Sequence, residues 1–355
     1  MFAINKKERI ESLQGLRVLA FVGIFLSHAI DTPTGAWGVS VFIMLSGFLM
    51  TYSYWDRNIG KLSIKDSVLF SINKIKTLYP LHIIMLIVAL LPYYLIPLFQ
   101  DYSSNEMLKL LFKIVITVPL IQAWFPAGFE AINTVAWYLS AMLFLYAVFP
   151  RILWRLKRYK ESNKVIVFMI LTYFAQFAFA FISRKVPLLS NAHWSCYILP
   201  LFRLGDFFIG CCLGYCFIKR KNNKTKTSYA TIVETIFIAM AVGGMVCQAY
   251  LTDSQWFTYT LVYIPSSAGI VYSLARKEGL ISRLLSMKCF QIMAVITPFA
   301  FLIHRQVIHY VEDGYKLATK TLMNPCLLIV LSMIITVVFS VLYMKVSLKK
   351  REGII

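Results

Sequence analysis

The sequence predicts an all-α polytopic membrane protein: a bundle of about 10 transmembrane helices plus one re-entrant or interfacial segment. Two observations support this fold class. Hydrophobic residues fill 59% of the 355 positions and charged residues only 15%, and the mean hydropathy is +0.69. Apolar stretches of about 20 residues, the length that crosses a bilayer, recur along the whole chain. The polar connections are too short for a separate soluble domain, so we expect one integral-membrane domain over residues 1–355.

Eleven apolar segments follow one another along the chain. They fall near Leu13–Ile30, Trp37–Trp55, Leu78–Phe99, Met107–Trp124, Asn133–Trp154, Lys164–Ser183, Cys196–Ile218, Ala230–Tyr250, Trp256–Ala275, Cys289–Val311 and Asn324–Val346. The first resembles a signal peptide, but the arginine inside it and the ten further segments favour a retained anchor. The chemically informative motifs occupy about residues 10–311, and residues 312–355 form the last helix and a tail.

The net charge of +20 lies mainly in short loops beside the apolar segments, which is the pattern of the positive-inside rule. Basic residues cluster before the first segment, in the tail, and in four connections, around Arg57–Lys76, Arg151–Lys164, Lys219–Lys226 and Arg276–Lys288. We therefore expect a multi-pass protein of the cell membrane with both termini in the cytoplasm. The partner of these charges is then the lipid bilayer or an anionic cosubstrate, and not nucleic acid.

One segment does not fit this charge pattern as a crossing. Three apolar segments lie between the basic loops at Lys76 and Arg151, and two loops on the same side are joined by two crossings, not three. The doubtful segment is Met107–Trp124, which contains a proline and two lysines. We expect it to be re-entrant or to lie along the outer interface, which leaves ten crossings.

No metal site is expected. Cys211, Cys212 and Cys216 lie inside an apolar segment, lack the spacing of a zinc site and have no histidine beside them. Small apolar packing residues are the simpler interpretation of these cysteines.

Arg17 and His28 are two ionisable residues in the first apolar segment. Their separation of eleven residues is close to three helical turns, so both lie on one helix face, roughly 16 Å apart along the axis. Ionisable groups in hydrocarbon are costly unless they face a partner or a cavity, so we interpret the pair as two ends of one site. Two structural alternatives are an arginine that snorkels to the interface and a histidine that bonds a backbone carbonyl.

Further polar residues lie in or beside later segments. Lys74 and Lys76 stand at the cytoplasmic start of the third segment, where they either set topology or contact phosphates. Ser46 lies in the small-residue stretch that follows Trp37, which also permits close helix packing. Other candidates are a second intramembrane histidine, His304, and a pair spaced i, i+3 that can form a buried ion pair, Arg203 and Asp206.

Together these motifs resemble the membrane acyltransferase family called acyltransferase-3, over about residues 10–311. The resemblance rests on their order and spacing: Arg17-x10-His28, Trp37-Gly38 through Leu45-Ser46-Gly47-Phe48, Phe202-Arg203 through Asp206-Phe207 with Gly210, and Leu302-Ile303-His304. The family often has two acidic residues after Trp-x-Leu-Ser, whereas this chain has Met142 and Leu143 there.

The resemblance implies transfer of an acyl group, commonly acetyl, from cytoplasmic acyl-CoA to a hydroxyl of a carbohydrate, a glycolipid or a related envelope acceptor. Acyl-CoA is then a cosubstrate and no cofactor is held permanently. His28 is expected to act as general base or as a nucleophile that carries the acyl group, and Arg17 to orient the donor. Lys74, Lys76 and Arg203 are expected to help bind the donor, and the remaining candidates, Ser46, Asp206 and His304, to line the substrate cavity.

The same motifs are compatible with a second function, that of an exporter. Some relatives on this scaffold are described as exporters of envelope polysaccharides, and the absence of the acidic pair after Trp137 leaves room for a polysaccharide or lipid-linked-sugar exporter.

Overall fold

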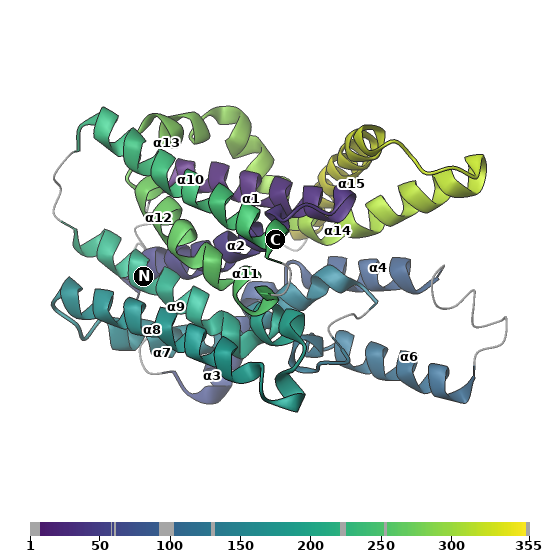
Figure 1. Cartoon of the computed structure of the whole chain (residues 1–355), viewed down its shortest axis with the longest axis horizontal. Helices are drawn as coiled ribbons and strands as arrows, with labels where there is room; N and C mark the ends of the chain where they lie inside the picture. Colours follow the sequence, from purple (N-terminus) through teal and green to yellow (C-terminus); the bar gives the residue numbers. More distant parts are fainter. Residues whose placement is uncertain are drawn as a thin grey trace.

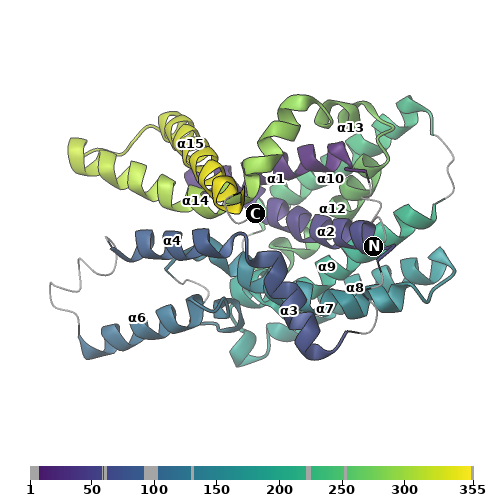
Figure 2. The same ribbon diagram turned by 180° about the vertical axis from the view of Figure 1, so that it is seen from behind.

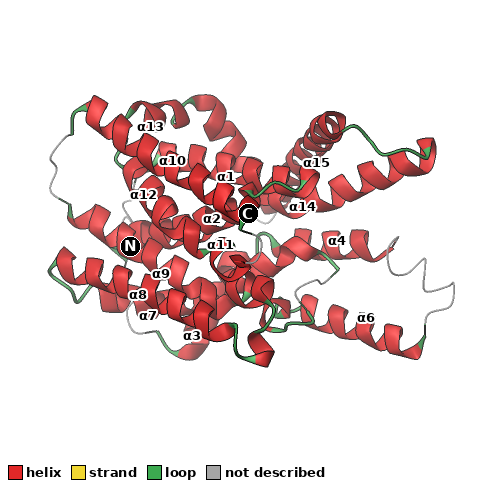
Figure 3. Cartoon of the chain, viewed as in Figure 1, coloured by secondary structure: helices red, strands yellow, loops and turns green. Residues whose placement is uncertain are grey.

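The computed structural model describes residues 8–57, 59, 62–91, 103–128, 132–220, 225–251 and 254–352. Throughout these ranges the chain forms helices joined by loops, with no strand (Figure 3). The predicted all-α fold class is therefore confirmed.

Eight helical stretches in the described ranges are long and apolar enough to cross a membrane. They are α1 (Glu11–Ile30), α2 (Thr34–Tyr54), η3 with α7 (Thr134–Leu156), α8 (Ser162–Ser183), η5 with α9 (Trp194–Lys219), α10 (Thr227–Tyr250), α14 (Lys288–Thr319) and most of α15 (Pro325–Glu352). A ninth is added if α3 (Ile64–Ile75) and α4 (Tyr79–Leu90), bent by 65° at their junction, count as one broken span. The described ranges thus contain eight or nine candidate spans beside the ten crossings predicted, and the number that crosses the membrane stays a prediction.

The segment predicted at Trp256–Ala275 accounts for part of this difference. It is broken into α11 (Gln255–Thr258), η7 (Leu261–Tyr263) and α12 (Ile264–Ala275). Thr260 lies between α11 and η7, outside both helices. Its hydroxyl donates to the carbonyl of Cys196 at 2.6 Å. Pro265 then lies in the first turn of α12, where the missing amide hydrogen of proline costs no helical hydrogen bond. Twelve residues rise only about 18 Å, less than the hydrocarbon core.

The doubtful segment Met107–Trp124 is also not one helix. A capping box of Ser103 and Glu106 starts α6 (Ser104–Thr117), which ends just before Pro119. Leu120 then adopts a left-handed conformation with φ 60°, and the chain continues into the short helix η2 (Gln122–Trp124). The expectation that this segment is no continuous span agrees with its shape. Whether it lies at the interface or re-enters stays a prediction. The far part of the segment predicted at Leu78–Phe99 lies outside the described residues beyond position 91.

The predicted cytoplasmic segments meet at one end of the helical assembly, which we call the basic end. Lys277 pairs with Glu11 at 2.9 Å, and Arg276 donates to Thr225 at 2.7 Å. The Lys157 ammonium donates to the carbonyl of Arg57 at 2.8 Å. The turn after α1, the residues before α9, Gln248 near the end of α10 and Tyr259 just after α11 instead surround one cavity at the other end, which we call the pocket end. The side of the membrane that each end faces stays a prediction.

Helix α2 runs through the middle of the molecule and packs closely on α9 (Figures 1 and 2). A Cβ atom on Gly47 would collide with the backbone carbonyl of Phe207, and one on Gly210 with that of Met44. The small-residue stretch of α2 therefore serves the packing role expected for it, since glycines let two helix backbones approach. Helices α4 and α6 and the junction of α14 with α15 extend beyond the other helices on one side (Figure 1).

Candidate active site

The last turn of α1 carries His28 into a cavity of about 360 Å³ at the pocket end. Arg17 lies three turns earlier on the same helix, as the spacing predicts, and it does not line this cavity. Helix α1 ends at Asp31, which is left-handed with φ 51°, and the following turn leads directly into α2. This tight connection places the start of α2 beside His28, so Gly35 and Ala36 line the same cavity.

His28 bonds a second imidazole. Its Nδ1 atom lies 2.8 Å from Nε2 of His304 on α14, and the two rings are nearly parallel, with centroids 5.0 Å apart. His304 is fully buried, and its Nδ1 lies 2.8 Å from the carbonyl oxygen of Phe301. The sequence suggested His304 as a lining residue, whereas the structure makes it a direct partner of His28.

This chain of contacts assigns a tautomer to each neutral ring. A carbonyl oxygen can only accept, so Nδ1 of His304 carries its proton and Nε2 of His304 is the acceptor. His28 must therefore donate from Nδ1, which leaves the lone pair of its Nε2 free. A histidine whose second nitrogen is oriented in this way is a suitable general base.

Arg305 is a cation beside the same histidine. Its Nη1 donates to the backbone carbonyl of His28 at 3.1 Å, and its side chain lines the cavity. The bond ties α14 to the end of α1, next to the imidazole pair. Arg305 follows His304 in the sequence, but it was not among the predicted site residues, because the fold alone shows which way its side chain points.

An aromatic wall forms one side of the cavity. The rings of His193 and Tyr197 are stacked with centroids 5.1 Å apart, and Tyr259 and Trp137 lie at 5.3 Å from His193 and 5.2 Å from Tyr197. All four residues line the cavity. Flat aromatic faces with a few polar groups among them are typical of small-molecule sites. Sequence reasoning missed His193, Tyr197 and Tyr259, since they come from separate segments with no shared motif.

His193 stands just before the membrane-spanning stretch that contains α9. Its burial, and next the positive charge of Arg203, lower the pKa of His193 to about 4. The imidazole is therefore neutral near pH 7 and can both donate and accept a hydrogen bond in the cavity.

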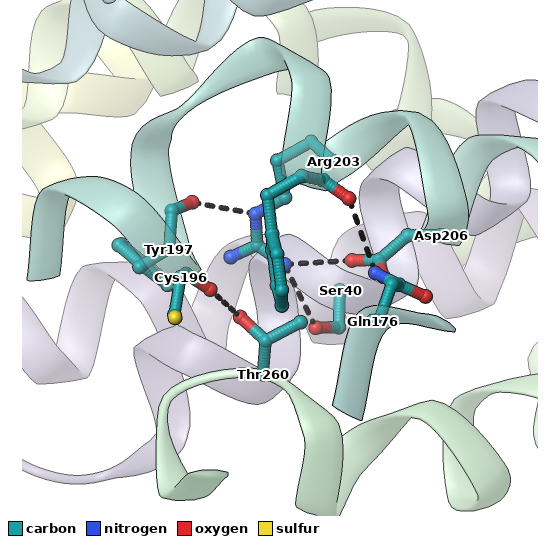
Figure 4. Close-up of polar contacts among 8 residues, drawn as sticks. Ser40, Gln176, Cys196, Tyr197, Arg203, Asp206 and Thr260 are labelled. Atoms are coloured by element: carbon teal, nitrogen blue, oxygen red, sulfur yellow. Dashed lines mark hydrogen bonds and ion pairs between the residues drawn. The ribbon is translucent and has the colours of Figure 1, made fainter. Parts of the chain in front are cut away.

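Arg203 and Asp206 form the predicted buried ion pair (Figure 4). Arg203 Nη1 lies 2.6 Å from Asp206 Oδ2, both side chains are fully buried, and Gln176 donates to the other carboxylate oxygen at 2.9 Å. Arg203 Nε donates to the carbonyl of Tyr197 at 2.5 Å, and its guanidinium lies over the Tyr197 ring.

Arg203 was expected to bind the donor and Asp206 to line the substrate cavity, and the structure places both behind the wall of the cavity at His28. Neither residue lines it, because Tyr197 stands between the ion pair and the open space. The pair instead holds the short π-helical stretch η5 (Trp194–Ile198) and thereby positions the aromatic wall. Contact of Arg203 with the acyl donor stays a prediction.

Arg17 belongs to a separate polar cluster nearer the basic end. Its Nη1 donates to Gln14 Oε1 at 3.2 Å, and the same oxygen accepts from Arg9 at 3.1 Å. Within the described ranges, no carboxylate lies within salt-bridge distance of Arg17. Two guanidinium groups that share one neutral amide oxygen are well suited to bind an anion.

Two tyrosines of α7 and Ser46 of α2 complete this inner cluster. Tyr138 and Tyr146 lie near Arg17 and near the side chain of Ser46, whose hydroxyl donates to the carbonyl of Phe42 at 2.8 Å. The predicted cavity residue Ser46 therefore lies with Arg17 and not in the cavity of His28.

Lys74 and Lys76 lie at the end of α3. The Lys74 ammonium sits 4.3 Å from the centre of the Tyr54 ring, and Arg57 lies 4.6 Å from the same centre. Lys76 is exposed in the turn after α3. A contact of either lysine with a donor stays a prediction. Among the residues that the structure describes, no group of three or more metal-ligating side chains comes together.

The amino-acid sequence is similar to known proteins. A family model described as an acyltransferase domain matches residues 10–345. A curated relative, the acyltransferase MdmB of Streptomyces mycarofaciens, is 28% identical over 239 residues, which cover 57% of this chain and 56% of that protein. The match thus spans little more than half the length of that relative. No solved structure matches the chain.

Proposed function

Because the chain belongs to the acyltransferase-3 family, we propose that it is a membrane enzyme that transfers an acyl group, in the first place acetyl, from acyl-CoA to a hydroxyl group. The donor arrives at the basic end, and a carbohydrate or glycolipid acceptor enters the cavity at the pocket end. The observation that carries this proposal is the bond from His28 to His304, which leaves Nε2 of His28 free beside the cavity.

His28 acts as the base in the transfer. Its Nε2 removes the hydroxyl proton while the acceptor oxygen forms a bond to the thioester carbonyl carbon. The carbon–sulfur bond then breaks, and His28 returns the proton to the leaving thiolate, which gives an ester and free CoA. His304 remains neutral and keeps the His28 ring in the reactive tautomer through its bond to the Phe301 carbonyl.

Arg17 and Arg9 supply positive charge for the donor. CoA carries phosphate groups, and guanidinium groups bind phosphate through paired, charge-assisted hydrogen bonds. The pair already converges on one amide oxygen without a carboxylate between them in the described structure. From Arg17 to His28 the helix rises roughly 16 Å, so an extended donor arm can hold its phosphates near Arg17 with its thioester at His28.

The cavity is matched to a small polar acceptor. Its volume of about 360 Å³ is at the lower end for small-molecule sites, which start at about 300 Å³, and leaves room for one or two sugar rings. The stacked rings of His193 and Tyr197 offer a flat face to a sugar ring. Asp31, Gln248 and Arg305 supply hydrogen-bonding groups for hydroxyls on the same walls.

The test uses membrane vesicles that contain the full-length protein and radiolabelled acetyl-CoA. We expect the label to appear as alkali-labile ester in the glycan or glycolipid fraction, and the variant His28→Ala to lose this incorporation while it still accumulates in the membrane. Substantial transfer by His28→Ala would refute both the base and the acyl-histidine mechanism. In cells, loss of surface-glycan esters with the polymer intact supports the enzyme, whereas loss of the polymer itself supports an exporter.

A further inference from the structure

Three aromatic rings from three helices meet between the two polar clusters. Phe42 of α2, Tyr138 of α7 and Phe301 of α14 contact one another pairwise, and we call them the aromatic triangle. Their ring centroids are 6.1 Å apart for Phe42 and Tyr138, 5.0 Å for Tyr138 and Phe301, and 6.0 Å for Phe42 and Phe301. All three distances are within the range of about 4.5–7 Å for rings in contact.

The triangle lies between Arg17 and the imidazole pair. On one side, Tyr138 lies near Arg17 and Ser46. On the other side, Phe301 lines the cavity of His28, and its ring centroid is 5.9 Å from that of His304. A donor bound at Arg17 therefore has to bring its thioester past these rings to reach His28.

Two residues of the triangle keep part of their surface accessible. Phe42 keeps part of its surface accessible, although its neighbours in the sequence, Val41 and Ile43, are fully buried. Tyr138 is likewise half-buried, and its ring contacts with Phe42 of α2 and Phe301 of α14 show that it points into the bundle and not toward lipid. A donor that passes between Arg17 and His28 can therefore contact these rings.

We infer that Phe42, Tyr138 and Phe301 select the acyl group by its length, and this inference rests on the proposed acyl transfer. When the thioester carbon is at His28, the carbons that follow it must lie against the triangle or in the cavity. The triangle is closed by ring contacts, and in the proposed function the acceptor takes the cavity, whose walls carry apolar side chains such as Ile24 and Val39 beside polar ones. An acetyl group needs no more room, whereas each added methylene meets the closed rings or competes with the acceptor.

The test compares the transfer rates of the full-length protein with acetyl-CoA and with hexanoyl-CoA. We expect the wild-type protein to prefer acetyl-CoA. Phe42→Ala and Phe301→Ala open the triangle and should raise the hexanoyl-to-acetyl rate ratio by about tenfold or more. Phe42→Trp should lower the ratio. If Phe42→Ala does not accumulate, Phe42→Leu makes a smaller opening at the same place.

The matched control is Phe217→Ala. Phe217 of α9 is also half-buried, and its ring contacts Phe48 at 5.4 Å, away from the triangle. This control should leave the ratio unchanged. Active variants of Phe42 and Phe301 with the wild-type ratio would overturn the length selection alone. A wild-type protein that transfers neither acyl group would overturn the proposed function and the inference with it.

Discussion

The two ends of the Arg17–His28 pair differ in how their polar groups are satisfied. His28 bonds His304 at 2.8 Å, and His304 bonds a backbone carbonyl at 2.8 Å, so both rings are fixed. Arg17 shares the amide oxygen of Gln14 with Arg9, at 3.2 and 3.1 Å. The first arrangement is ready for proton transfer, whereas the second leaves positive charge that a bound anion can neutralise.

The largest effect is expected on the stability of the protein when the ion pair behind the aromatic wall is broken. Asp206→Ala leaves the fully buried Arg203 without its carboxylate, which should destabilise the protein by about 3–5 kcal/mol. Thermal unfolding in detergent measures this loss. The double variant Arg203→Met/Asp206→Leu removes both charges and should recover much of the stability. A single variant as stable as the wild-type protein would contradict the structural role of the pair.

Substitution of His304 removes the hydrogen bond that fixes the His28 ring. His304→Phe keeps a ring against its aromatic neighbours but cannot accept from His28, so kcat should fall by on the order of 10–100-fold. KM for acyl-CoA should stay unchanged, because the donor phosphates bind elsewhere. His304→Gln offers an amide oxygen as acceptor and should recover part of kcat. Equal rates for Phe and Gln variants would mean that His304 only fills space.

The variant Arg17→Gln tests whether Arg17 binds the phosphates of the donor. Loss of one charge-assisted contact should raise KM for acyl-CoA by about tenfold with a smaller change in kcat. The KM of the variant should also depend less on salt concentration than that of the wild-type protein. Arg184→Gln makes the same charge change at the exposed pocket end and serves as the control. An identical rise in KM for both variants would argue against an anion site at Arg17.

The smallest effect is expected in how the stability of the protein depends on pH through His193 of the aromatic wall. Because the pKa of His193 is lowered from 6.5 to about 4, the unfolded chain binds a proton in this interval that the folded protein does not. Stability should therefore fall as the pH drops from 6.5 towards 4. His193→Gln removes this contribution, so its unfolding temperature should vary less over that interval. Parallel curves for the two proteins would show that His193 is not buried as described.

Several features of the fold and site could be predicted because they depend on near neighbours in the sequence. Hydropathy and length predict the spanning helices, and the spacing of Arg17 and His28 places them on one helix face. The i, i+3 spacing likewise predicts the contact of Arg203 with Asp206. Each of these depends on the local geometry of a single helix.

Other features depend on contacts that no local pattern encodes. The partner of His28 is 276 residues away, and the aromatic wall joins α7, the loop before α9 and the α10–α12 connection. The segment at Trp256–Ala275 was predicted as one span, yet its helix is interrupted at Thr260, whose hydroxyl donates to the carbonyl of Cys196. Tertiary hydrogen bonds override the local preference there.

The sequence by itself determined that this is a helical membrane protein and that one helix carries a cation and a base three turns apart, because hydropathy and helical periodicity are local properties. Only the tertiary structure decided that Ser46 belongs with Arg17, that Arg203 stands behind Tyr197, and that His304 orients His28. These relations depend on which helices pack together, and packing brings distant residues within hydrogen-bonding distance.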